Sequence, residues 1–155
     1  MADAVSSIAE LKRKLAPGAR LLGLDVGEKT IGLALSDTTL TVASPMTTIR
    51  RGKFAADAER IAGIAAEEGV GGLVLGLPIN MDGSEGPRCQ SVRQFARNLG
   101  ERLPLPLAFW DERLSTAAVT RTLLSADMTR KRRAETVDKL AAAYILQGAL
   151  DAARG

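Results

Sequence analysis

Residues 21–37 constrain the fold of this chain more than any other part of its sequence. Two apolar runs, residues 21–26 and 31–35, flank a polar turn that begins with Gly27. Apolar runs separated by a short glycine-containing turn predict a β-hairpin, and glycine supplies the backbone freedom that such a turn needs. Asp25 stands near the end of the first run, where packing alone would favour an apolar side chain. It therefore either caps backbone N–H groups of the turn or serves as a metal ligand.

After the hairpin the pattern changes from antiparallel strands to alternating strands and helices. Residues 41–49 predict a third strand, and Pro45 inside it suits the edge of a sheet because proline cannot donate to a ladder. Residues 53–68 have helical spacing, and the wholly apolar residues 72–77 predict a central parallel strand. The remaining predicted elements are a loop over 78–86, a helix over 88–102, a fifth strand over 105–110, a helix over 115–126 and a helical C-terminus.

This order of elements predicts one α/β domain spanning residues 1–155. Its core is a mixed five-stranded sheet, in which three antiparallel strands are followed by a parallel βαβ unit, flanked by helices. A right-handed crossover places the fourth strand beside the first. Residues 1–19 are expected to form an N-terminal extension on the outside, with a short helix over 6–15. A chain of 155 residues, 46% of them hydrophobic, is large enough to bury one substantial core.

Composition narrows the chemistry that such a domain can perform. Histidine is absent, so hydrolytic chemistry must rest on carboxylates. Cys89 is the single cysteine, which excludes an intrachain disulfide and any multi-cysteine zinc site and fits a reducing compartment. The chain shows neither a signal peptide nor an apolar run long enough to span a bilayer, so we expect a cytoplasmic protein without a membrane partner. A net charge of +3 permits an anionic partner.

Acidic residues stand at three separate places where strands or helices face a core. Asp25 ends the first strand, Asp111 and Glu112 follow the fifth, and Asp138 lies near the start of the last helix. In that helix, spacing by three and four places Asp138 on the apolar face, which also carries Ala141, Ala142, Ile145 and Ala149. The carboxylate of Asp138 is therefore expected to point towards the sheet.

Two explanations are open for these acids. A buried carboxylate needs a partner, and Lys139 or Arg113 would supply one in a purely structural role. Alternatively, carboxylates converging from two strand ends and a helix form an all-oxygen site suited to Mg²⁺ or Mn²⁺. Two such ions would stabilise the attacking and leaving oxygens of a phosphodiester undergoing hydrolysis.

Four motifs in succession resemble those of the bacterial YqgF/RuvX family. They cover nearly the whole chain beyond Arg20 and are LDVGEKTIGLA (24–34), VLGLPINMDGSE (74–85), DERLST (111–116) and VDKLAA (137–142). The resemblance implies an RNase H-like fold and a cytoplasmic nuclease that matures the 5′ end of pre-16S rRNA, with resolution of Holliday junctions as an older proposal.

Carried over by position, the catalytic and metal-binding acids of this family fall on Asp25, Glu112 and Asp138, with Asp111 as the uncertain neighbour. Related junction resolvases carry their second acid after the fourth strand, where this chain has Leu77 and Pro78. The site here must therefore be completed from the fifth strand, which weakens the case for junction cleavage.

Residues that could contact a nucleic acid lie in loops and on one helix. Loops at the carboxyl ends of central strands commonly bind ligands in α/β sheets, and a basic segment over 127–133 immediately precedes the last helix. The candidates are Asn80, Ser84, Arg88, Arg113, Arg130, Arg132 and Arg133. Each has a structural alternative, namely a capped turn for the loop residues and a solvated surface for the arginines. With only 3% aromatic residues, recognition should rest on backbone shape rather than on stacked bases.

Two other functional classes also fit parts of the sequence. The turn after Asp25 could hold a nucleotide phosphate, as in actin-like kinases, although no second phosphate loop of similar form is present. A catalytically silent RNA-binding assembly factor would retain the same acids without turnover. Assays of ATP binding and of nuclease activity separate these possibilities.

Overall fold

A computed structural model describes residues 5–114 and 130–154, with side chains for 7–114 and 138–153. The strands form one mixed sheet in the order β1-β6-β5-β2-β3-β4. The elements are β1 (Val5–Ser6), α1 (Ile8–Lys14), β2 (Arg20–Val26), β3 (Thr30–Ser36), β4 (Ala43–Arg50), α2 (Phe54–Glu68), β5 (Val70–Leu77), α3 (Pro87–Arg102), β6 (Leu107–Asp111), the 3₁₀ turn η2 (Glu112–Leu114) and α5 (Arg130–Arg154).

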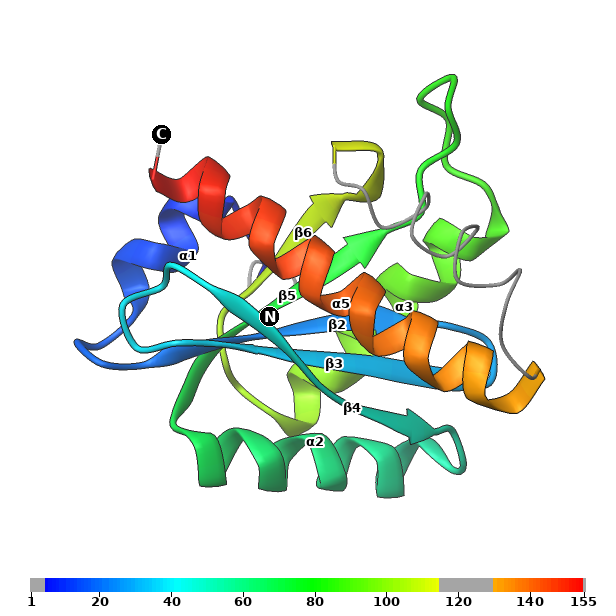
Figure 1. Ribbon diagram of the computed structural model, residues 1–155, viewed down its shortest axis with the longest axis horizontal. Helices are drawn as coiled ribbons and strands as arrows, with labels where there is room; N and C mark the ends of the chain where they lie inside the picture. Colours follow the sequence, from blue (N-terminus) through cyan, green and yellow to red (C-terminus); the bar gives the residue numbers. More distant parts are fainter. Residues whose placement is uncertain (1–4, 115–129, 155) are drawn as a thin grey trace.

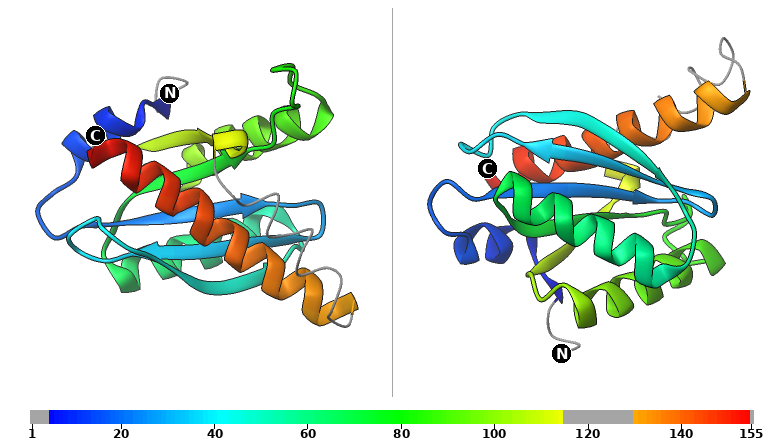
Figure 2. Two further views of the ribbon diagram at one scale, coloured as in Figure 1. Left: turned by 45° about the horizontal axis from the view of Figure 1, so that its top comes forward. Right: turned by 90° about the horizontal axis from the view of Figure 1, so that it is seen from below.

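Helices cover both faces of this sheet (Figures 1 and 2). Side chains of α2 and α3, such as Ile61 and Val92, pack with Leu22 and Leu24 on one face. On the other face α5 crosses the sheet diagonally and packs with α1, burying Ile145 and Leu146. Alternation of side chains along β2 explains how one strand serves both layers.

The predicted mixed sheet of three antiparallel strands followed by parallel strands is confirmed. β2 pairs antiparallel with β3, and β3 with β4. β5 lies parallel to β2, as the right-handed crossover predicts. β4 forms one edge of the sheet and contains Pro45, at a point where the pairing with β3 is irregular. The other edge differs from the prediction, because the two-residue strand β1 pairs with β6 and gives the sheet six strands.

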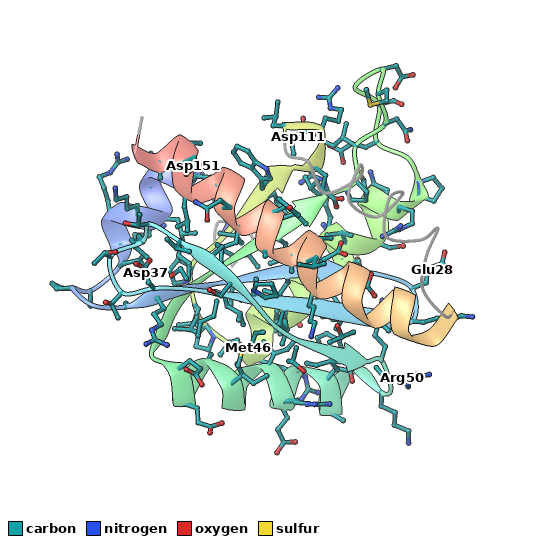
Figure 3. All side chains as sticks on the ribbon, viewed as in Figure 1. Glu28, Asp37, Met46, Arg50, Asp111 and Asp151 are labelled. Carbon is teal, nitrogen blue, oxygen red and sulfur yellow. The ribbon has the colours of Figure 1, made fainter. Side chains whose placement is uncertain are left out.

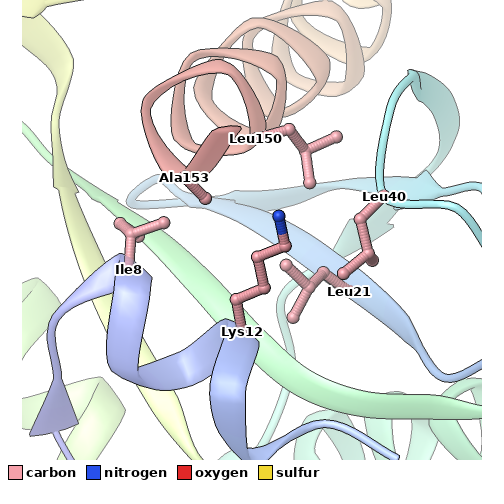
Figure 4. A pocket seen from close by; sticks show the side chains of 6 residues that line it. All are labelled: Ile8, Lys12, Leu21, Leu40, Leu150 and Ala153. Atoms are coloured by element: carbon pink, nitrogen blue, oxygen red, sulfur yellow. The ribbon is translucent and has the colours of Figure 1, made fainter. Parts of the chain in front are cut away.

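The N-terminal segment packs into the fold instead of lying outside it. Leu11 of α1 is fully buried between the sheet and α5. Leu21 and Leu150 lie with Lys12 around a small pocket under α1, into which the Lys12 side chain points (Figure 4). The short helix predicted over 6–15 is therefore present as α1, and its apolar face belongs to the core.

The beginning of the last helix is a second correction. We expected residues 127–133 to form a basic loop, but the backbone is helical from Arg130 onwards. A charged run has no apolar periodicity from which a helix can be recognised, so the sequence pattern starts the helix too late. The helix predicted over 115–126 lies outside the described residues. No helix in the described part of the chain is long and apolar enough to cross a membrane.

Glycines allow α5 to approach the sheet closely at the end where the predicted acids lie. A Cβ atom on Gly23 of β2 would lie 2.8 Å from the Cβ of Leu146, and one on Gly32 of β3 would overlap the backbone carbonyl of Asp138. Any larger residue at these positions would push the helix away from the strands. The sequence thus fixes the position of α5 through the small size of two strand residues.

Candidate active site

The carboxyl ends of β2, β5 and β6 lie at the same end of the sheet, because these three strands run parallel. Asp25 is the last residue but one of β2, and Glu112 directly follows β6 in η2. Their side chains are buried, with relative exposures of 2% and 6%. Two buried carboxylates at one end of the sheet are costly unless each has a partner, so packing alone does not explain them.

Alternation along β2 places Asp25 on the face that α5 covers. Leu21 and Gly23, four and two residues earlier, pack against that helix. Glu112 reaches the same face, since a Cβ atom on Gly76 would lie 3.0 Å from its Oε2 atom and 2.5 Å from Ile145 of α5. Gly76 follows Leu75, which pairs with Leu24 of β2. The carboxylate of Glu112 therefore lies over β5, which is the neighbour in the sheet of the strand that carries Asp25.

Asp138 reaches this region from the helix. Its backbone carbonyl lies against Gly32, which pairs with Asp25 across β2 and β3. Its side chain accepts a hydrogen bond from the hydroxyl of Thr30, the first residue of β3. The structure thus brings Asp25, Glu112 and Asp138 to the same face and the same end of the sheet, although they are far apart in the sequence.

Asp111 has a different environment from its neighbour. Its Oδ2 atom lies 2.7 Å from Nη2 of Arg113, and its Oδ1 atom accepts the backbone N–H of Arg113 at 2.9 Å. These hydrogen bonds from Arg113 hold the pKa of the Asp111 carboxyl below its ordinary value. Asp111 is more exposed than Glu112 and is the last residue of β6 (Figure 3). Arg113, which we considered as a structural partner for the buried acids, is instead paired with Asp111.

The residues at this edge have the chemistry of a magnesium site. Carboxylate oxygens are the ligands that Mg²⁺ and Mn²⁺ prefer. Among the side chains described, however, no three His, Cys, Asp or Glu residues form a group that could hold a metal ion. Mg²⁺ in nucleic-acid enzymes is commonly held by one or two carboxylates together with substrate phosphates. The donor types therefore fit a metal that is bound jointly by protein and substrate.

The loop between β5 and α3 forms a closed turn of its own. The amide of Asn80 donates to Oγ of Ser84 at 3.1 Å, and the backbone N–H of Ser84 donates to Asp82 at 2.9 Å. Hydrogen bonds from Ser84 lower the pKa of Asp82, so the loop carries a negative charge at its centre. Asn80 and Ser84 are exposed at a part of the chain that projects from the domain (Figure 1). Their polar groups are engaged with each other, as the structural alternative predicts.

The predicted basic contacts are placed only in part. Arg88 lies in the first turn of α3 and donates through Nη2 to the backbone carbonyl of Val26 at 3.1 Å. Arg113 is exposed beside Asp111. The side chains of Arg130, Arg132 and Arg133 lie outside those described.

Two residues at this end of the sheet were not singled out from the sequence. Thr30 binds Asp138, and Arg51 donates through Nη1 to the backbone carbonyl of Gly27 at 2.6 Å. Both contacts join segments that are distant in sequence, so no local sequence pattern predicts them. The position of Thr30 directly after the turn was the one available signal, since residues there lie beside the end of the preceding strand.

Comparison with known proteins identifies the family of the chain. A family model described as "RuvX: Holliday junction resolvase" matches residues 19–152. The chain belongs to the RuvX family. A RuvX relative from Paramagnetospirillum magneticum, named "Putative pre-16S rRNA nuclease", is 66% identical over 143 residues, which cover 92% of each chain. A relative of the same name from Rhodospirillum centenum is 60% identical and covers 97% of this chain and 83% of its own.

Solved structures place the RuvX chain in the RNase H-like fold. The structure of Thermus thermophilus RuvC in complex with a Holliday junction substrate matches with a TM-score of 0.54 at 12% identity, covering 88% of this chain and 96% of that chain. Another Thermus thermophilus RuvC structure gives a TM-score of 0.52 at 10% identity, with the same coverage of both chains. At these identities the likeness shows the fold alone.

Proposed function

We propose that this RuvX protein is a metal-dependent nuclease that hydrolyses a phosphodiester bond of pre-16S rRNA near its 5′ end. The observation that carries this proposal is the placement of Asp25, Glu112 and Asp138 on the same face and at the same end of the sheet. The names of the relatives supply the substrate. Because those relatives are bacterial and named for ribosomal RNA, we also propose a cytoplasmic location.

The three acids have distinct roles in this proposal. Asp25 and Glu112, held by strand ends, would form the rigid part of the site, and Asp138 would complete it from the helix. Two bound Mg²⁺ or Mn²⁺ ions would stabilise charge on the attacking and leaving oxygens. The buried positions of Asp25 and Glu112 restrict water around them, which strengthens their interaction with cations.

Resolution of Holliday junctions is the second candidate. It is supported by the description of the family model and by the RuvC-like fold. Against it stands the end of β5, where Leu77 occupies a position at which related resolvases carry an acid. An assembly factor that binds RNA without cleaving it is the third candidate, and it differs from the other two by the absence of turnover.

One experiment separates these candidates. The purified protein is incubated with a precursor RNA spanning the 5′ end of 16S rRNA and, separately, with a four-way DNA junction, in Mg²⁺, Mn²⁺, Ca²⁺ or a chelator. We expect cleavage of the RNA in Mg²⁺ or Mn²⁺ only, since Ca²⁺ has larger and looser coordination. Asp25→Asn should abolish cleavage while preserving the circular dichroism spectrum. Cleavage in chelator, or full activity of Asp25→Asn, would remove the proposed chemistry.

The basic residues at the start of α5 form a separate part of the proposal. Arg130, Arg132 and Arg133 begin the helix that carries Asp138, so they are tethered within a few residues of the acids. If they contact phosphates, changing all three to Ala should weaken RNA binding about equally across sequences. The slope of log affinity against log salt should fall by roughly 0.7 to 0.9 per lost contact. A filter-binding titration at several salt concentrations measures this, and an unchanged slope would retire these contacts.

A further inference from the structure

An open pocket of about 320 Å³ lies beside the turn between β2 and β3, apart from the three acids. Its walls come from that turn, from the residue after β4 and from the first turns of α3, and they include Val26, Gly27, Glu28, Arg51, Arg88 and Ser91. Val26 belongs to the face of the sheet that α2 and α3 cover. The pocket therefore lies at the same strand end as Asp25 but towards the opposite face.

The guanidinium groups of Arg51 and Arg88 are held in this pocket by the backbone of the turn. Arg51 donates to the carbonyl of Gly27 at 2.6 Å, and Arg88 donates to the carbonyl of Val26 at 3.1 Å. Arg51 is also packed over the ring of Phe95, with 5.3 Å to the ring centroid. A guanidinium has five N–H donors, so these contacts fix each side chain and leave donors for a ligand.

As far as the structure describes the chain, the charges of these two arginines are not balanced by a carboxylate, unlike those of three other arginines. Arg20, Arg93 and Arg113 each form an ion pair with a carboxylate. Within the described residues neither Arg51 nor Arg88 does so. Glu28 also lines the pocket and reduces its charge, but it is exposed and forms no ion pair with either guanidinium in the described part. Glu28 and the neighbouring Arg50 mark this end of the molecule in Figure 3.

The helix that forms one wall adds to the positive potential. α3 begins at Pro87 with Gly86 as its N-cap, and no side chain caps its first N–H groups. The amino end of a helix carries a partial positive charge and favours anions. Ser91 brings a hydroxyl donor to the same wall. This wall supports the two arginines, which are the main determinants of the site.

We infer that this pocket binds a phosphate of the nucleic-acid backbone other than the one that is cleaved. Two guanidinium groups match the geometry of a phosphate, which they can bind through paired N–H donors. Val26 and Gly27 directly follow Asp25 in the chain. A nucleic-acid strand that crosses this end of the sheet therefore meets both the acids and the pocket. Substrate binding here rests on the proposed nuclease function, whereas the anion site itself rests on the arginines.

The test measures binding of oligonucleotides that each carry one neutral methylphosphonate linkage at a different position. Binding is measured in chelator, so that nothing is cleaved, for the wild type, for Arg51→Gln/Arg88→Gln and for Arg60→Gln. Arg60 is an exposed arginine in the middle of α2 that does not line the pocket, and its variant controls for the loss of a positive charge outside the pocket. Inorganic phosphate is titrated in parallel, because free phosphate shares the chemistry of the backbone group.

We expect one linkage, different from the cleaved one, at which the neutral group weakens wild-type binding about tenfold, as for one charge-assisted contact. At that linkage the double variant should show no weakening, while Arg60→Gln should behave as the wild type does. Equal weakening of the wild type and the double variant at every linkage would overturn the inference. Competition of inorganic phosphate with the oligonucleotide, without any linkage effect, would overturn it too. If the linkage effect is found but the wild type cleaves no RNA in Mg²⁺, the nuclease proposal fails and the pocket stands.

Discussion

The hydroxyl of Thr30 donates a hydrogen bond to the carboxylate of Asp138, 108 residues further along the chain. Thr30 is the first residue of β3, and Asp138 lies in the first half of α5. The contact ties the helix to the turn that follows Asp25. Thr30 therefore positions a carboxylate of the proposed site without being expected to touch the substrate.

Removal of this hydroxyl should lower turnover more than it lowers substrate binding. A hydrogen bond to a charged group contributes about 1.5–3 kcal/mol, and loss of 1.4 kcal/mol in the transition state lowers the rate about tenfold. Thr30→Val should thus reduce kcat about tenfold with little change in KM, and Thr30→Ser, which keeps the hydroxyl, should restore most of it. Steady-state cleavage of precursor RNA measures both constants. Equal kcat values for the Val and Ser variants would mean that the hydroxyl does not orient Asp138.

The carboxylate of Asp37 should make the loop after β3 sensitive to acid. It accepts hydrogen bonds from the hydroxyl of Thr39 and from the backbone N–H groups of Thr41 and Val42. These bonds, the Thr39 hydroxyl first, lower its pKa from 3.8 to about 2. A carboxyl whose pKa is lowered by folding stabilises the folded state above its unfolded pKa and loses that effect as the pH falls through the folded pKa.

The contribution of Asp37 should therefore be complete above about pH 4 and should disappear towards pH 2. Titration of the carboxyl resonance by NMR measures the pKa directly. Denaturant unfolding of Asp37→Asn between pH 2 and 6 should show a weaker dependence on pH than the wild type over this window. A wild-type pKa near 4 would show that the three donors do not hold the carboxylate.

The parts of the fold that the sequence predicted are those with a strong local pattern. Apolar runs defined β2, β3 and β5, and helical spacing defined α2 to within one residue. β1 was missed because two residues cannot show a periodicity, and its pairing with β6 depends on segments far away in the chain. The charged start of α5 was missed for a related reason, since it has no apolar stripe.

The site divides in the same way. Asp25 and Asp138 were recognisable because each is an acid on a surface that the local pattern predicts to be buried. Their mutual placement depends on Gly32, whose small size matters only once α5 lies against β3. Thr30 and Arg51 act through contacts between distant segments, and the family motifs gave no reason to prefer them over neighbouring polar residues. The relative placement of these residues therefore depends on long-range packing, which local sequence patterns do not show.

Of the two adjacent acids at the end of β6, Asp111 and Glu112, Glu112 should be the one required for cleavage. Glu112 is buried over Gly76, whereas Asp111 is occupied by Arg113. Glu112→Gln should abolish cleavage with little loss of stability, because the amide has nearly the same volume. Asp111→Asn should leave cleavage within about fivefold of wild type, since a partly exposed ion pair contributes about 1 kcal/mol or less. Both are measured by RNA cleavage at saturating Mg²⁺, and the opposite ranking would show that Asp111 is the ligand.

Gly32 should be the strand position that is least tolerant of a larger side chain. A methyl group there would overlap the backbone carbonyl of Asp138 and lie 2.8 Å from the backbone nitrogen of Lys139. Backbone atoms of a helix cannot move aside as a flexible side chain can, so α5 itself would have to shift. Overpacking of this kind typically costs about 1–3 kcal/mol. Gly32→Ala should therefore lower the free energy of unfolding by this amount.

The same shift would move Asp138 away from Asp25, because Gly32 pairs with Asp25 in the sheet. Cleavage by Gly32→Ala should consequently fall even at temperatures where the variant is fully folded. Gly63 provides the matched control, since it is exposed in α2 and a methyl group there meets nothing within 4 Å. Gly63→Ala should raise the free energy of unfolding by about 0.5–1 kcal/mol, through the higher helix propensity of alanine, and should leave cleavage unchanged. Denaturant unfolding and RNA cleavage of the two variants, measured side by side, test the placement of α5. If Gly32→Ala were as stable and as active as the wild type, α5 could not lie as close to β3 as the structure describes.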